Sequence, residues 1–356
     1  MANKRVLVVS TSRKTRGGIT SVVHAHETGE QWEKYHCRWI ETHRDGPSWR
    51  KLAYFIRAIV QFAFLIPFYD LVHIHAADGA SAKRKWLFAR IAKLFKKKIL
   101  VHIHLGDEQK LLDPSQNQYL LKLLHLADKI IILSPQWKRW LLKVMPEAEN
   151  IAYELYNPCG HVQRNNSTPK KKQILLAGTI CKRKGYDTAL KGFSITAQKY
   201  PDWKLVFAGN PSLLEGFDEL EDGKRLAKEY GIENQVEWLG WISGKTKERV
   251  FNETSIYCLA STSEGFPMCV LDAWAYGIPC VMTPVGGIPD IVKDGEQGLI
   301  FPVGDSLKMA EALDRMIGNE NLRARIVSET DKLVAKSFDI DAISHQLDDI
   351  YQSLLS

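Results

Sequence analysis

The sequence has few of the features that mark a secreted or membrane-spanning protein. Its six cysteines, at positions 37, 159, 181, 258, 269 and 280, form no CxxC pair, which favours free thiols in a reducing compartment. The N-terminus runs into an apolar strand without the hydrophobic region of a signal peptide. The longest apolar run, Ala58 to Phe68, contains Gln61 and is shorter than the roughly 20 residues that span a bilayer. We therefore expect a cytoplasmic chain without a transmembrane anchor.

Length and charge indicate two unlike halves. A chain of 356 residues is longer than a usual single domain. Its 45% hydrophobic and 25% charged residues are ordinary for a soluble globular protein. Residues 1–160 hold 25 Lys/Arg against 14 Asp/Glu, whereas the remainder holds 23 against 27. The basic N-terminal half is therefore expected to meet an anionic surface.

Strand-like and helix-like segments alternate along the chain, which predicts an α/β fold with parallel sheets. The alternation pauses at the polar, lysine-rich segment 163–172 and then begins again. We therefore expect a Rossmann-like domain at 1–162, a linker at 163–172, and a second Rossmann-like domain at 173–336. Two such domains in series predict a cleft lined by the C-terminal ends of strands. The last segment, 340–356, is predicted to be a helix that packs back on the first domain.

The most informative stretch is Ser261 to Cys280, where a strand ends in an acidic, glycine-containing loop that leads into a helix. Pro267 suits the first helical position because that residue's N–H has no partner in a helix. The amides that follow would lie at the positive end of a helix and could bind a phosphate. Glu264 and Asp272 flank them, eight positions apart. The pattern indicates a phosphorylated, hydroxyl-rich ligand such as a nucleotide sugar.

Two further loops could bind anions. Gly178 to Gly185 carries three consecutive cations at 182–184 after a predicted strand, a pattern suited to a diphosphate, although such runs are also common on solvated surfaces. Gly17 and Gly18 follow the first strand and precede a helix. That pair resembles the anion cradle of a dinucleotide fold, but GxGxxG is absent, and the glycines could simply form a turn.

Histidines end two predicted strands in near-copies of one pattern, His73-Ile-His75 and His102-Ile-His104. These histidines could form a zinc site or could have a purely structural role. We expect that they bind no metal. His104 is best placed to hydrogen-bond a ligand, because it ends its strand and precedes a glycine turn.

The segment 81–98 is predicted to form an amphipathic helix with its lysines and arginines on the face opposite its apolar residues. It contains eight Lys/Arg and no Asp/Glu. Such a helix can rest on an anionic membrane surface, or it can simply cover a sheet with its charges in water.

The segments 263–277 and 286–302, together with 178–185, resemble family-4 retaining glycosyltransferases of the GT-B fold, the glycosyl transferases group 1. The resemblance implies two Rossmann-like domains facing across a cleft. It implies transfer of a sugar from a UDP- or GDP-linked donor to a hydroxyl acceptor. It also suggests a glycan or a polyprenyl-linked acceptor, such as a lipid-linked oligosaccharide of bacterial surface polysaccharide synthesis, and no cofactor beyond the donor. Another GT-B activity, such as nucleotide-sugar epimerisation, and nucleic-acid binding are the alternatives.

The resemblance also assigns roles to individual residues. It makes His104 and Glu264 catalytic, both near the donor sugar, while Asp272 binds the ribose and Lys184 the diphosphate. The full set of expected donor-binding residues is Gly17, Gly18, Lys182, Arg183, Lys184, Trp241, Gly265, Phe266, Pro267, Met268, Cys269 and Asp272.

The sequence departs from the family pattern at three positions. Asp272 and Asp290 stand where glutamate is common, and Thr179 stands where the family has an arginine. Lys182 or Arg183 could replace that missing cation.

Overall fold

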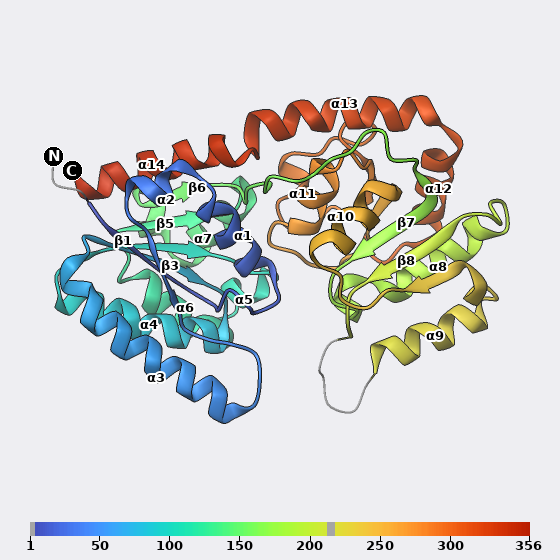
Figure 1. The fold of residues 1–356 in the computed structure, drawn as a ribbon. Helices are drawn as coiled ribbons and strands as arrows, with labels where there is room; N and C mark the ends of the chain where they lie inside the picture. The colour runs from blue at the N-terminus through green and yellow to red at the C-terminus, as the bar shows by residue number, and fades with distance from the viewer. Residues whose placement is uncertain (1–3, 212–217) are drawn as a thin grey trace. The chain divides into compact units, whose positions relative to one another are not determined.

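The computed structural model describes residues 4–211 and 218–356; the first three residues of the N-terminal segment considered above lie outside this range. The chain divides into two compact units, residues 1–159 with 337–356 and residues 160–336. Each unit is built on a six-stranded, wholly parallel sheet (Figure 1). The predicted α/β architecture of two Rossmann-like domains is confirmed.

The N-terminal unit has the strand order β2-β1-β3-β4-β5-β6. Its strands are β1 (Val6–Ser10), β2 (Arg38–Glu41), β3 (Leu71–Ala76), β4 (Lys98–Ile103), β5 (Lys129–Ile132) and β6 (Ala152–Glu154). Its helices are α1 (Gly18–Glu27), α2 (Glu30–Lys34), α3 (Ser48–Leu65), α4 (Gly79–Leu94), α5 (Gln109–Leu112), α6 (Pro114–Leu124), α7 (Pro135–Val144) and α14 (Ile340–Leu355).

The C-terminal helix α14 belongs to the core of the N-terminal unit. Its apolar face, including Ile343 and Leu347, packs with β-strand residues such as Val8 and Leu100. Asp348 accepts hydrogen bonds from Lys34 Nζ and Tyr35 Oη at 2.6 Å each. The last 16-residue helix therefore completes a domain that begins some 330 residues earlier.

The C-terminal unit has the strand order β12-β11-β10-β7-β8-β9. Its strands are β7 (Lys171–Ala177), β8 (Lys204–Ala208), β9 (Val236–Trp238), β10 (Thr254–Leu259), β11 (Cys280–Met282) and β12 (Leu299–Ile300). Its helices are α8 (Tyr186–Ala197), α9 (Glu219–Glu229), α10 (Gly244–Glu253), α11 (Met268–Ala275), α12 (Ser306–Gly318) and α13 (Glu320–Ser337). Because β7 starts as early as Lys171, the expected linker 163–172 is shortened by two residues.

The basic segment 81–98 differs from the predicted helix in two ways. Helix α4 ends at Leu94, Lys96 has φ 52°, and Lys98 already begins β4. Lys85 does not join a solvated basic face: it is fully buried and its Nζ donates to Thr42 Oγ1 at 2.6 Å. Burial, with help from the nearby Arg84, lowers the pKa of Lys85 to about 7.

Among the residues that the structure describes, one helix has the length and apolarity expected of a membrane span, the segment Ser48–Phe68 that comprises α3 and the turn after it. Such a helix is weak evidence for a span by itself. All six cysteines lie in the described residues and are free thiols.

Candidate functional site

The C-terminal unit changes winding direction at one point of its sheet. Strand β7 comes first in the sequence of this unit, yet it lies between β8 and β10. In sheets of this kind, ligands bind beyond the carboxyl ends of the strands at such a switch point. The loops that leave β7 and β10 there are the two loops that carry Lys184 and Glu264.

These two loops are joined by an ion pair. Lys184 Nζ lies 2.6 Å from Glu264 Oε1, and the Ser261 hydroxyl donates to the same oxygen at 2.7 Å. Arg183 Nη1 lies 3.5 Å from it and donates to the carbonyl of Ser263 at 2.7 Å. Glu264 is only 8% exposed, so its carboxylate depends on these partners.

Both members of the pair are held in the charged form. Burial alone would lower the pKa of Lys184, but the Glu264 carboxylate outweighs it and raises that pKa. Burial would likewise raise the pKa of Glu264, but Lys184 and Arg183 lower it. One carboxylate faces two cations here, so the site retains a positive charge that suits a diphosphate.

Only two of the three consecutive cations point to Glu264. Lys182 instead lines a separate hollow with Asp187, Lys191 and Asp222, beside helix α8. Arg183 is therefore the second cation beside Glu264.

Close backbone contacts hold these loops in place. A Cβ on Gly286, which has φ 58°, would lie 2.3 Å from the carbonyl oxygens of both Glu264 and Gly265. The Gly287 N–H donates to the Gly265 carbonyl at 2.9 Å. On the other loop, a Cβ on Gly185 would lie 2.0 Å from the Ala260 carbonyl oxygen. Only glycine allows such contact at these two positions.

Helix α11 begins at Met268, with Pro267 as its N-cap rather than its first helical residue. Among the described residues, no side chain caps this end. The amides of Met268 and Cys269 thus occupy the positive end of the helix, next to the buried Phe266, as an anion site requires.

Asp272, the second predicted carboxylate, is paired with a residue that the sequence did not single out. Lys247 Nζ of α10 lies 2.8 Å from Asp272 Oδ2. The sequence does place Lys247 in the first turn of a helix that follows a strand-end loop, a position from which a side chain can reach a ligand site. Trp241, in the loop after β9, is 40% exposed, and its backbone N–H donates to Asn210 Oδ1 at 3.0 Å.

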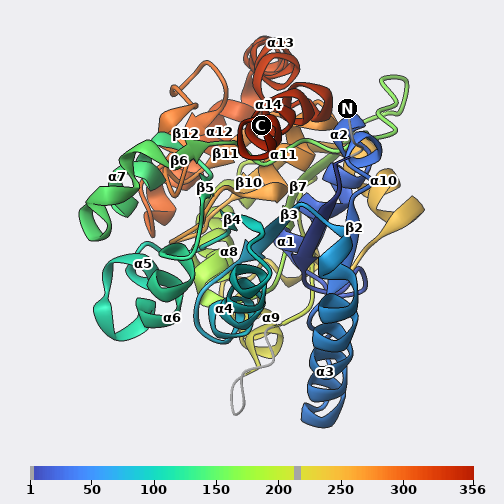
Figure 2. The same ribbon diagram turned by 90° about the vertical axis from the view of Figure 1, so that its left-hand side faces the viewer.

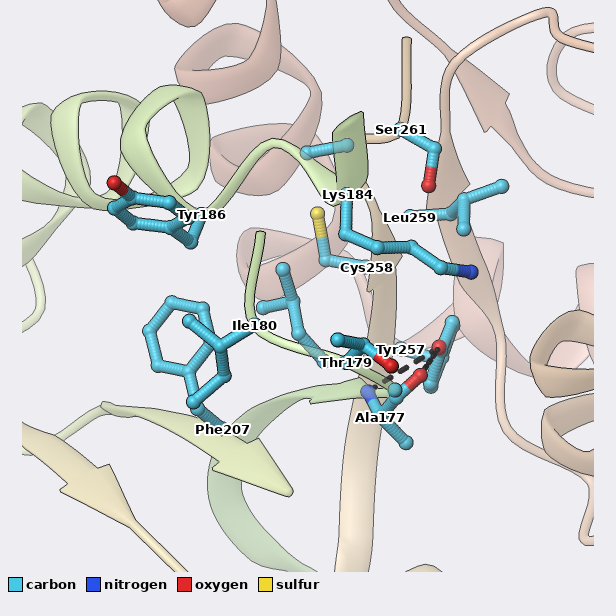
Figure 3. Close-up of a pocket in the computed structure, with 13 residues that line it drawn as sticks. Ala177, Thr179, Ile180, Lys184, Tyr186, Phe207, Tyr257, Cys258, Leu259 and Ser261 are labelled. Atoms are coloured by element: carbon cyan, nitrogen blue, oxygen red, sulfur yellow. Dashed lines mark hydrogen bonds between the residues drawn. The ribbon is translucent and has the colours of Figure 1, made fainter. Parts of the chain in front are cut away.

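A hollow opens at the switch point between the ends of β7 and β10 (Figure 3). Lys184 extends across it, with its ammonium on the side of Ser261 and Leu259. At the edge of the hollow, the Tyr257 hydroxyl forms hydrogen bonds with the backbone N–H and carbonyl of Ala177. Thr179 also lines the hollow.

In the N-terminal unit, Gly17 has φ 147° and is the N-cap of α1, and both Gly17 and Gly18 are exposed. The predicted glycine turn therefore leads directly into a helix. Among the described residues, no side chain caps the start of α1.

The four strand-end histidines form one stack, because β3 and β4 are neighbours with His75 in register with His102. His104 is half-buried, and its Nε2 lies 2.9 Å from His75 Nδ1. His73 Nδ1 lies 2.7 Å from the Tyr351 hydroxyl of α14. His26 of α1 adjoins the same stack, 6.1 Å from His75 and His102 between ring centroids.

His73, His75 and His102 have ring nitrogens close enough to be considered as metal ligands. However, the rings of His73 and His102 are parallel to within 2°. The lone pair of an imidazole lies in the ring plane, so stacked rings direct their nitrogens side by side rather than to one ion. The arrangement suits a packed core of neutral histidines.

Residues 161–333 match the family model for glycosyl transferases group 1. The C-terminal unit belongs to that family. An uncharacterized glycosyltransferase of Haemophilus influenzae is 31% identical over 198 residues, covering 54% of this chain and 53% of the relative. The lipopolysaccharide core biosynthesis glycosyltransferase LpsE of Rhizobium meliloti is 26% identical over 191 residues, covering 53% and 51%. The chain thus spans about half the length of these relatives.

Solved structures share the fold of the whole chain. HepE of Anabaena, in complex with UDP and glucose, superposes with a TM-score of 0.78 at 17% identity, covering 98% of this chain and all of HepE. The lipopolysaccharide outer core galactosyltransferase WaaB gives 0.67 at 20% identity, covering 98% of this chain and 99% of WaaB. The expected GT-B fold is confirmed.

The histidine stack predicts acid sensitivity. Burial lowers the pKa of His26 to about 4 and that of His104 to about 3, and it lowers those of His73, His75 and His102 well below the usual value for histidine. Below pH 6.5 the unfolded chain binds protons that the folded chain does not, so stability falls as pH drops toward 4.

Urea unfolding at pH 7 and pH 5 measures this loss. His26→Leu should make the loss smaller, while replacing the exposed His345 by Leu should leave it unchanged. Equal stability of the wild-type protein at both pH values would contradict the interpretation.

The contact of Gly286 with the Glu264 loop predicts a second stability effect. Gly286→Ala adds a steric clash to the cost of positive φ, which is about 1–2 kcal/mol. Gly304→Ala is the matched control, because Gly304 has φ 75° and nothing within 4 Å of its Cβ position. We expect Gly286→Ala to lower the free energy of unfolding more than the control. Equal losses would show that the close approach does not constrain the loop.

Proposed function

We propose that this protein is a retaining glycosyltransferase that moves a sugar from a nucleotide diphosphate sugar to a hydroxyl acceptor without a divalent metal. The observation that carries the proposal is the convergence of Lys184 and Arg183 on the buried Glu264. This cluster lies at the switch point of a group 1 domain, in the unit whose helix α11 begins without a side-chain cap. Fixed cations and helix amides are the groups that stabilise a departing diphosphate.

In the proposed reaction, the bond from the anomeric carbon to the diphosphate breaks while an acceptor oxygen bonds to that carbon on the same face. The bonding electrons leave with the diphosphate, which gains negative charge. Lys184, Arg183 and the amides of Met268 and Cys269 stabilise that charge, and the acceptor proton passes to the departing phosphate oxygen. In this proposal Gly17 and Gly18 also bind the donor, as the resemblance implies.

Glu264 and Asp272 orient the donor's hydroxyl groups in this proposal. Glu264 accepts from the sugar while it keeps Lys184 in place. Asp272 has one oxygen held by Lys247, which leaves Oδ1 for the ribose. His104 keeps the role implied by the resemblance, a hydrogen bond to the donor sugar, through Nδ1 because Nε2 is bound to His75.

The proposed donor is UDP- or GDP-linked, and the complexes of HepE with UDP and with UDP-glucose support the first. The proposed acceptor is a lipid-linked oligosaccharide of a bacterial surface polysaccharide. This acceptor is supported by the similarity to LpsE, which is named as a lipopolysaccharide core biosynthesis glycosyltransferase. The basic N-terminal half also supports it. We also propose that segment 81–98 touches an anionic membrane, through exposed cations such as Lys83, Arg90 and Lys96 rather than through Lys85.

Removing either charge of the Lys184–Glu264 ion pair should abolish most of the glycosyl transfer. We expect Lys184→Met and Glu264→Gln each to lower kcat/KM about 10²-fold, as loss of one preorganised electrostatic contact does, and His104→Ala to do the same. Lys191→Met, an exposed lysine of α8, is the control.

The assay first selects the donor by thermal shift with a panel of nucleotide sugars, then follows nucleoside diphosphate release with and without acceptor. Unchanged turnover in all three variants would refute the proposal. A rearranged nucleotide sugar formed without acceptor would favour epimerisation.

Arg183 and Lys182 lie in different surroundings, so replacing them should change the donor KM by different amounts. Arg183→Met should raise the donor KM at least about tenfold, because a charge-assisted contact is worth about 1.5–3 kcal/mol. Lys182→Met should raise it less, since Lys182 lies beside another hollow. A larger effect at Lys182, measured by donor titration, would make Lys182 the replacement for the missing arginine instead.

A further inference from the structure

Helix α3 has two apolar faces, and only one of them is covered by the protein. The covered face includes Ala58 and Phe62, which are at most 1% exposed. Phe55 and Phe62 pack edge-on against Phe88 of α4. This face packs α3 onto the N-terminal unit.

The other face presents a line of large apolar side chains to solvent. They are Trp49, Leu52, Ile56, Val60, Phe64 and Phe68, each between 54% and 74% exposed. Their spacing of three or four residues places them on one side of the helix and the turn that follows it. Single exposed apolar residues are common, but a continuous stripe marks an interaction surface.

The end of α4 extends this apolar stripe. Leu94 is 81% exposed and Phe95 44% exposed. Lys97 Nζ donates to the Pro67 carbonyl at 3.3 Å, which ties the end of α4 to the end of α3. Both views of the fold place α3 at the outer edge of the N-terminal unit (Figures 1 and 2).

The charges on the two segments that carry the stripe are positive. Residues 46–69 contain Arg50, Lys51 and Arg57 and no Asp or Glu, and residues 79–98 contain eight cations and no acid. Asp128 neutralises part of this charge by pairing with Lys93 and Lys98. A second copy of the chain docked on this face would bring like charges together, whereas anionic headgroups above an apolar layer complement both features.

We propose that α3 lies flat in the interface of an anionic membrane and inserts this apolar stripe among the lipids. The helix does not span the bilayer in this arrangement. If α3 crossed the bilayer, Phe62 and Ile66 would have to leave the core, where both are fully buried. Arg57 would also have to enter the hydrocarbon layer. Trp49 is at the N-terminal end of the stripe, where its indole suits the headgroup level.

Vesicle co-sedimentation without donor or acceptor tests the proposal, so its outcome is separate from any result on glycosyl transfer. The probes are phosphatidylcholine vesicles with and without phosphatidylglycerol, at low and high salt. The test variant is Val60→Glu with Phe64→Glu. Its matched control is Val303→Glu with Leu307→Glu, a pair of the same spacing in the C-terminal unit that is 45% and 64% exposed.

We expect the wild-type protein and the control to bind the anionic vesicles, with part of the binding resisting high salt. The test variant should bind at least about tenfold less, because it places two charges among lipids. A blue shift of tryptophan emission on binding should shrink in Trp49→Phe, which disturbs folding little. Equal binding by the test variant would overturn the proposal, and so would absence of wild-type binding. Self-association that the test variant abolishes, without vesicle binding, would assign the face to a second copy instead.

Discussion

The contact between Lys184 and Glu264 is the interaction on which the C-terminal unit's site depends. It joins the loop after β7 to the loop after β10 at the switch point of the sheet. Removing one partner of a buried ion pair typically costs about 3–5 kcal/mol, and here Ser261 and Arg183 would share that loss. The ion pair therefore fixes the two loops in a charged, preorganised arrangement that neither loop would keep by itself.

The N-terminal unit depends on a different constraint, the burial of ionisable groups in their neutral form. Five histidines meet where α1, β3, β4 and α14 come together, and Tyr351 of α14 bonds to one of them. The helix that closes this core is supplied by the last residues of the chain. This unit consequently cannot complete its core until the rest of the chain has been made.

Much of the architecture was predictable because it rests on local patterns. Alternating apolar segments of strand and helix length indicated the two parallel sheets. The Glu264 loop and Lys184 were recognisable from residue type and spacing. Lys247 was not singled out, because a lysine in a helix is usually solvated, and only the tertiary structure brings it to Asp272.

The sequence by itself determined the fold class, the group 1 resemblance and the loops that carry the candidate site, because each is encoded in residues close together in the chain. The tertiary structure decided which side chains meet. It turned Arg183 toward Glu264 and Lys182 away, buried Lys85 inside an otherwise basic helix, and left one apolar face of α3 in solvent. Hydrophobic periodicity shows that a helix has an apolar face but not whether a neighbour covers it, since that depends on contacts between distant segments.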